Sequence, residues 1–91
     1  MVVYPAIFKK VDNGYMVRFP DIPEAMTEGD TINQAYEMAI EVLGLALEDY
    51  HIFPKPSAYH SIQQKYPNSI ITLVGIDLKD YRSQYVSESL K

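Results

Sequence analysis

The side chains of this 91-residue chain that could do chemistry are its carboxylates and its two histidines, because such groups bind metals and transfer protons. Asp21, Glu28 and Asp30 lie close together in the sequence and could be taken for a metal site. A proline-bounded corner and the start of a helix explain them structurally, so we expect no metal and no cofactor. His51 and His60 have no HExxH-type spacing and no paired nucleophile. We therefore expect no catalytic residue and no enzymatic activity.

Two groups of side chains could instead bind a partner. Glu37, Glu41 and Glu48 fall on one side of the helix expected over residues 31–50. Such a row is usually a solvated helix face, and its alternative is an acidic surface that steers a basic partner. Tyr59 and Tyr66 lie in a proline-bounded segment. They could pack in a small satellite cluster of this chain, or they could be aromatic anchors of an interface. The sequence leaves both pairs of alternatives open.

The composition, 47% hydrophobic and 22% charged, is typical of one globular domain. The absence of cysteine excludes a disulfide framework and a Cys-ligated zinc site, and it fits the reducing cytoplasm. No stretch has the length of a membrane span, and the N-terminus lacks a signal-peptide pattern. A net charge of −4 disfavours nucleic-acid binding, which needs clustered Lys and Arg, and favours a basic protein partner.

The element expected to position these groups is one long helix over residues 31–50. Thr31 can act as its N-cap, with Gln34 completing a capping box. Asn33 and Gly44 fall with the three glutamates on the wet side. The apolar positions follow helical spacing and form one stripe that we expect to be buried: Ile32, Ala35, Tyr36, Ala39, Leu43, Ala46, Leu47 and Tyr50.

A second apolar flank of that helix, made of Met38, Val42 and Leu45, extends the stripe over more than half of the circumference. It leaves room for a contact with another chain. With an edge strand also available for pairing, we expect a homodimer or a higher even-numbered oligomer.

The first strands are expected to form a hairpin. Val2–Val11 is rich in β-branched and aromatic residues, and Pro5 within it predicts an edge strand or a local break. Asn13 and Gly14 favour a type I′ turn, after which residues 15–19 return. The prolines at positions 20 and 23 should stop pairing and leave a short third strand at 25–28.

After the long helix, Ser57 could cap a short helix over residues 58–65, and residues 69–77 (SIITLVGID) should form a central strand. The order β-β-β-α-(short α)-β predicts an α+β fold. A mostly antiparallel sheet of three to four strands would be covered by one long helix.

Three motifs carry a family resemblance: Y-P-A at 4–6, G-Y-x-V-x-F-P-D-I-P at 14–23 and T-x-G-D-T at 27–31, followed by Ala35 in the helix. They resemble the HicB antitoxins of HicA/HicB toxin–antitoxin pairs over roughly residues 2–76. The resemblance implies a partial RNase H-like fold that binds a small basic HicA-type toxin. That toxin would cleave mRNA with a histidine, and the antitoxin would occlude its active site. Glu37, Glu41, Glu48, Tyr59 and Tyr66 are the candidate toxin-binding residues.

Fuller members of the family carry a C-terminal DNA-binding segment. We expect residues 1–78 to form the HicB-like domain and residues 79–91 to form a tail or linker, without DNA binding. Two other functions are compatible with the fold. A degenerate RNase H-like nuclease is disfavoured because Val2–Val11 contains no Asp or Glu. A small oligomeric ligand-binding or scaffold module is the other alternative.

Overall fold

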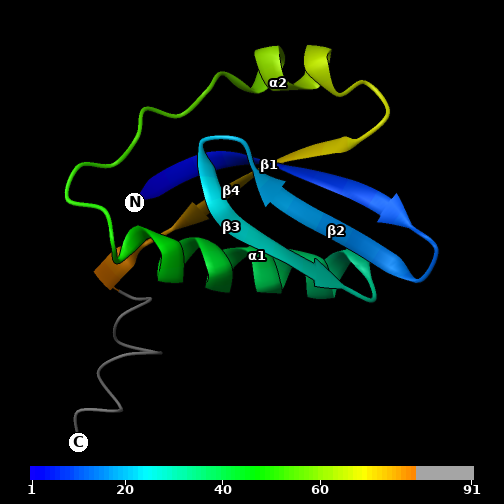
Figure 1. Cartoon of the computed structure of the whole chain (residues 1–91), viewed down its shortest axis with the longest axis horizontal. Coiled ribbons are helices and arrows are strands. Elements are labelled where there is room, and N and C mark those ends of the chain that lie inside the picture. Colours follow the sequence, from blue (N-terminus) through cyan, green and yellow to red (C-terminus); the bar gives the residue numbers. More distant parts are fainter. Residues whose placement is uncertain (80–91) are drawn as a thin grey trace, which may run out of the picture.

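The computed structural model describes residues 1–79. Its elements follow in the order β1 (Val2–Val11), β2 (Gly14–Phe19), β3 (Ile22–Gly29), α1 (Ile32–Leu47), α2 (Tyr59–Lys65) and β4 (Ile70–Ile76). The four strands form one antiparallel sheet in the order β3-β2-β1-β4. Figure 1 shows α1 along one side of this sheet and α2 on the other. The predicted α+β class, with its antiparallel sheet and one long helix, is confirmed.

The start of α1 is the predicted one. The Thr31 hydroxyl accepts a hydrogen bond from the Gln34 N–H at 3.1 Å, and the Gln34 side-chain oxygen accepts one from the Asp30 N–H. At the other end, the N–H groups of residues 48–50 donate to carbonyls three residues back, in 3₁₀ fashion. The α-helix therefore ends at Leu47 instead of Tyr50.

The main core lies between α1 and one face of the sheet. Alternate residues of β1, Tyr4, Ala6 and Phe8, point into it and are buried, as the period of a strand requires. From α1 it receives most of the predicted stripe, of which Ala35, Ala39, Leu43, Ala46 and Leu47 are buried.

Gly44 is also buried, so its expected place on the wet side of α1 is wrong. It lies in one i, i+4 row with Tyr36 and Ile40, which pack against the same core. The buried face of the helix is therefore centred nearer to this row than the apolar spacing indicated. Ile32, at the start of the stripe, is exposed.

The edge strands are not the predicted ones. β1 runs unbroken between β2 and β4, so the prediction that Pro5 marks an edge or a break is wrong. The ladder with β2 extends only from Val11 to Ile7, and Pro5 lies beyond it, so no β2 pair is lost.

β4 lies at an edge, so the central position predicted for residues 69–77 is wrong as well. Ile71 is buried on the α2 face of the sheet, and Val74 and Ile76 are buried on the α1 face. The two helices therefore account for the apolar composition of this strand without a second neighbouring strand.

The β1–β2 turn contains Asp12 and Asn13 between the paired residues Val11 and Gly14. A type I′ turn needs a positive φ at both turn residues, but Gly14 alone among residues 1–79 has a positive φ, of 152°. The type I′ prediction is therefore wrong. A Cβ atom at Gly14 would collide with the carbonyl oxygen of Gly29, so glycine is required by both conformation and space.

The corner after β2 is tighter than predicted. Phe19 pairs with Ile22 across a two-residue turn, and β3 begins at Ile22 instead of at residue 25. The register then shifts, so that Arg18 pairs with Met26. Pro23 lies in this irregular part of an edge strand, where a missing N–H costs little.

Truncating the α1 core should destabilise the fold strongly. Leu43 is fully buried between α1 and the sheet, so Leu43→Ala should lower the free energy of unfolding by about 2–5 kcal/mol. Leu45→Ala is the matched control, because Leu45 is 58% exposed on the same helix, and it should cost under about 0.5 kcal/mol. Urea denaturation measures both, and equal losses would contradict the observed orientation of α1.

Candidate partner-binding surfaces

The segment between α1 and α2 carries the chain from one face of the sheet to the other (Figure 1). Two polar contacts hold it. Asp21 accepts hydrogen bonds from the N–H of Ser57 at 2.8 Å and from its hydroxyl at 2.5 Å, while the Tyr4 hydroxyl donates to the carbonyl oxygen of Pro54. Ser57 is therefore engaged by the hairpin corner, and the prediction that it caps α2 is wrong. The N-cap is Ala58, without a side-chain hydrogen bond.

The titration of nearby groups follows from these contacts. Burial raises the pKa of the Tyr4 hydroxyl above its ordinary value, and the negative charge of Asp21 adds to this. Tyr50, just after α1, donates a hydrogen bond of 2.7 Å to the Glu24 carboxylate. That bond lowers the pKa of Glu24 and raises that of Tyr50. The Tyr50–Glu24 bond therefore joins β3 to the segment after α1, as the Asp21–Ser57 contact joins the hairpin corner to it.

The acidic surface is formed by the outer side of α1. Glu37, Glu41 and Glu48 are all exposed there, as the helical spacing predicts. Within residues 1–79, none of the three makes a side-chain hydrogen bond or an ion pair. Their charges are therefore directed to solvent and are not neutralised locally, which is the condition for long-range attraction of a basic partner.

Tyr66 and Tyr59 lie on the opposite side of the molecule. Tyr66 follows α2 and packs against a small cluster of Ile7, Ile62 and Ile71 on the second face of the sheet. Its ring also lies under the Arg18 guanidinium, 5.0 Å from the ring centroid. Tyr66 therefore has the packing role that was one of its two alternatives.

Tyr59 is 40% exposed at the start of α2, and its hydroxyl lies 3.5 Å from the Gln63 amide nitrogen. The five candidate residues are thus divided between two faces of the sheet. The structure does not bring the glutamates and the tyrosines into one site.

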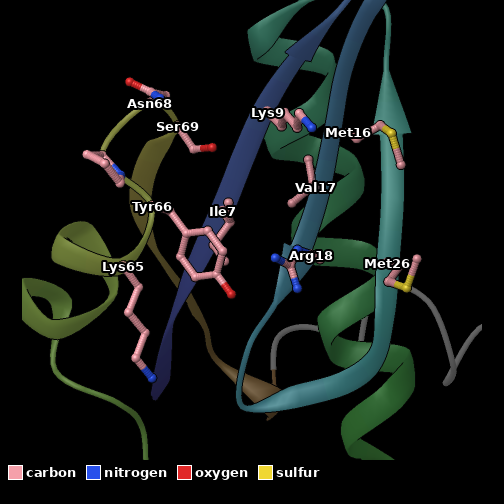
Figure 2. Close-up of a pocket in the computed structure, with 11 residues that line it drawn as sticks. Ile7, Lys9, Met16, Val17, Arg18, Met26, Lys65, Tyr66, Asn68 and Ser69 are labelled. Carbon is pink, nitrogen blue, oxygen red and sulfur yellow. The ribbon is translucent and has the colours of Figure 1, made fainter.

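A groove of about 530 Å³ opens between the end of α2 and the sheet face that α1 leaves uncovered (Figure 2). Its lining includes no acidic residue. Side chains from β1, β2, β3 and α2 converge on it, and Figure 2 shows the Tyr66 ring between the strands and Lys65. The groove combines cations with polarisable apolar groups, namely Lys9, Arg18, Lys65, Met16 and Met26.

The basic groove was not predicted from the sequence. Met16 and Arg18 alternate with the buried residues of β2, so the strand period already indicated that they share the other face. Lys65 is brought beside them only by the position of α2. The sequence signal was limited to the two outward-facing residues of β2, Met16 and Arg18. Two such residues are too few to predict a groove.

The carboxylates considered as metal ligands are not brought together. Asp21 lies before β3 and binds Ser57, whereas Asp30 lies after its other end. Within the described part of the chain, no group of three or more His, Asp or Glu residues could hold a metal ion. His60 contacts Gln64 at 3.1 Å on the surface of α2, and His51 is exposed in the loop.

Comparison with known proteins decides the family. Residues 4–88 match the model of the HicB-like antitoxins of bacterial toxin–antitoxin systems. The chain belongs to this HicB-like antitoxin family. Antitoxin HicB 1 of Photorhabdus laumondii is 52% identical over 48 residues, covering 52% of this chain and 31% of that protein. The family identity indicates a non-enzymatic role.

Solved HicB structures share the fold of this HicB-like chain. The N-terminal domain of Burkholderia pseudomallei antitoxin HicB is 25% identical with a TM-score of 0.74, over 85% of this chain and all of that one. A chain of the HicA3 and HicB3 toxin–antitoxin complex is 26% identical with a TM-score of 0.66, over 84% of this chain and 99% of that one.

The HicB-like chain spans between 31% and 62% of the length of the curated relatives it matches. Of the expected tail at 79–91, all but Lys79 lies outside the described residues. No helix within residues 1–79 is long and apolar enough to cross a membrane.

The contact between Asp21 and Ser57 should stabilise the chain by a measurable amount. Because a partly buried carboxylate accepts two hydrogen bonds there, Asp21→Ala should lower the free energy of unfolding by about 1–3 kcal/mol. A double-mutant cycle with Ser57→Ala isolates the pair, and its coupling energy should lie between about 0.5 and 3 kcal/mol. Strictly additive losses would show that the contact contributes nothing of its own.

Proposed function

We propose that this chain is the antitoxin of a HicA-type mRNA-cleaving toxin and that it acts by covering the toxin's active site. The observation that carries the proposal is the similarity to a chain of the HicA3 and HicB3 toxin–antitoxin complex, of which 99% is covered. Inhibition by covering needs a complementary surface and no reacting group, so neither catalysis nor a cofactor is required. The reaction that is blocked takes place on mRNA, and the cytoplasm is the compartment that the proposal implies.

The outer side of α1 is the surface we assign to the toxin. Three exposed carboxylates, Glu37, Glu41 and Glu48, lie on it, and within residues 1–79 they have no hydrogen-bond or ion-pair partner. The exposed Met38 and Leu45 flank them and add apolar area. A small basic partner would gain both charge complementarity and burial on this side.

The basic groove is a poorer surface for a basic toxin. Its cations Lys9, Arg18 and Lys65 would repel a positively charged partner, and no lining carboxylate offsets them. Charge therefore favours the α1 side over the groove for the first encounter. The groove remains available for contacts with a neutral or acidic part of the partner.

The test replaces the three glutamates of α1 with lysine. Glu37→Lys/Glu41→Lys/Glu48→Lys should slow association with the toxin about tenfold or more at low salt and weaken inhibition of RNA cleavage. The wild-type association rate should also fall as salt rises, since the Debye length falls from about 10 Å at 0.1 M to about 3 Å at 1 M. Stopped-flow association and a cleavage assay give the two readouts.

The control variant changes net charge equally at another place. Asp12, Glu24 and Glu28 are exposed and belong to the hairpin and β3, so their change to lysine adds the same positive charge away from the outer side of α1. This variant should keep most of the wild-type association rate. If both variants associate at the same rate, the outer side of α1 is not the docking surface.

A further inference from the structure

The cations of this acidic chain are unevenly distributed over its surface. Residues 1–79 contain six Lys and Arg side chains against ten Asp and Glu side chains. Three of the six cations, Lys9, Arg18 and Lys65, line the groove between α2 and the sheet, and none of the ten carboxylates does. Cations gathered in a concave site concentrate anions there, even on a protein whose net charge is negative.

The rest of residues 1–79 does not neutralise these three cations. All three side chains are exposed, and within this part of the chain none makes an ion pair or a side-chain hydrogen bond. The Arg18 guanidinium lies over the Tyr66 ring, 5.0 Å from its centroid, a contact that involves its charge and no hydrogen-bond acceptor. The groove therefore offers positive charge and N–H donors to a ligand.

The register of the sheet places two of the cations within reach of one anion. Lys9 pairs with Met16, and Arg18 lies two residues further along β2 on the same face. Such diagonal neighbours are about 7–8 Å apart, a distance that two long side chains can span from both ends. Arginine binds a phosphate through paired N–H donors and lysine binds it as a point charge. Lys65 adds a third positive charge from the end of α2.

The remaining lining of the groove suits a flat apolar group. Met16 and Met26 are 46% and 57% exposed, and their polarisable thioethers make favourable contacts with aromatic rings. In Figure 2, Arg18 lies between the Tyr66 ring and Met26. A guanidinium plane is itself a surface on which nucleobases stack. The Ser69 hydroxyl at the same groove can donate to or accept from the edge of a base.

We propose that this groove binds a single nucleotide, with the phosphate held by Lys9, Arg18 and Lys65 and the base lying against the two methionines. An anion site beside an apolar platform fits a ligand that is charged at one end and aromatic at the other. The volume of about 530 Å³ falls within the range of small-molecule sites, roughly 300–1,000 Å³. The groove and the outer side of α1 lie on different faces of the sheet, so this inference is independent of toxin binding.

A carboxylate beside the groove favours one nucleotide over a nucleic-acid strand. Glu28 pairs with Met16 and lies two residues beyond Met26, so it flanks the apolar side of the groove. A strand that continued past the base would bring its next phosphate towards this negative charge. The net charge of −4 also repels a polyanion, which needs several cations along its length.

The experiment is an NMR titration of the full chain with adenosine monophosphate. Amide signals of groove residues should shift in a saturable way, with a Kd below about 1 mM, while those of α1 should not. Lys9→Gln and Arg18→Gln should each raise the Kd about tenfold, because each removes a charge-assisted hydrogen bond. The spectra of the ligand-free variants check that each one is folded.

The matched control is Lys10→Gln, which removes the same charge from the next residue of β1. The Lys10 ammonium lies over the Tyr15 ring, 5.2 Å from its centroid, and Lys10 does not line the groove. Solvent and salt screen a charge outside the site, so this variant should change the Kd by less than about twofold. If Lys10→Gln weakens binding as much as both groove variants do, the groove is not the site.

Three further probes identify the ligand. Inorganic phosphate and adenosine should each bind at least about tenfold more weakly than adenosine monophosphate, since each lacks part of the contacts. Phosphate binding as tightly would show an anion site only, and a single-stranded oligoadenylate binding about tenfold tighter would show a site for a strand. Either result would overturn the proposal, and so would the absence of saturable shifts up to about 10 mM nucleotide. No readout involves the toxin, so failure here leaves the antitoxin proposal untouched.

Discussion

The passage of the chain from one face of the sheet to the other is the constraint on which the rest of the structure depends. A single helix covers one face, so the second cluster of apolar residues must be covered by the segment after α1. The carboxylate of Asp21 and the hydroxyl of Tyr4 bind this connecting segment at Ser57 and Pro54. These contacts orient the entry to α2, which then covers Ile7 and Ile71. The groove at Tyr66 lies beside the other end of α2.

Local sequence signals predicted the helices and strands well, but they predicted poorly which strands lie next to each other in the sheet. The N-cap at Thr31 and the bounds of β1 depend on a few adjacent residues, and both were predictable. The interchange of edge and centre between β1 and β4 was not, because β propensity reports a half-buried pleated surface and not a position in the sheet. The Asp21–Ser57 contact joins residues 36 apart, and no spacing rule connects such positions.

The candidate site residues also divide into those whose placement could be predicted from the sequence and those whose placement could not. Exposure of the three glutamates follows from helical period alone, and the structure has them exposed. The packing of Tyr66 depends on three isoleucines from separate elements, so the sequence could only offer two alternatives for it. The cations of the groove come from β1, β2 and the end of α2. Their convergence is a property of the sheet order and of the loop contacts, which sequence reasoning did not supply.

Charge and backbone geometry separate the surfaces of this small molecule. Carboxylates lie on the outer side of α1, cations lie on the opposite face of the sheet, and the open backbone edge lies on β4. A basic partner would therefore meet favourable charge on the outer side of α1 and unfavourable charge in the groove. Charge alone can select the face of the molecule before any close contact forms, because it acts over a longer range than packing.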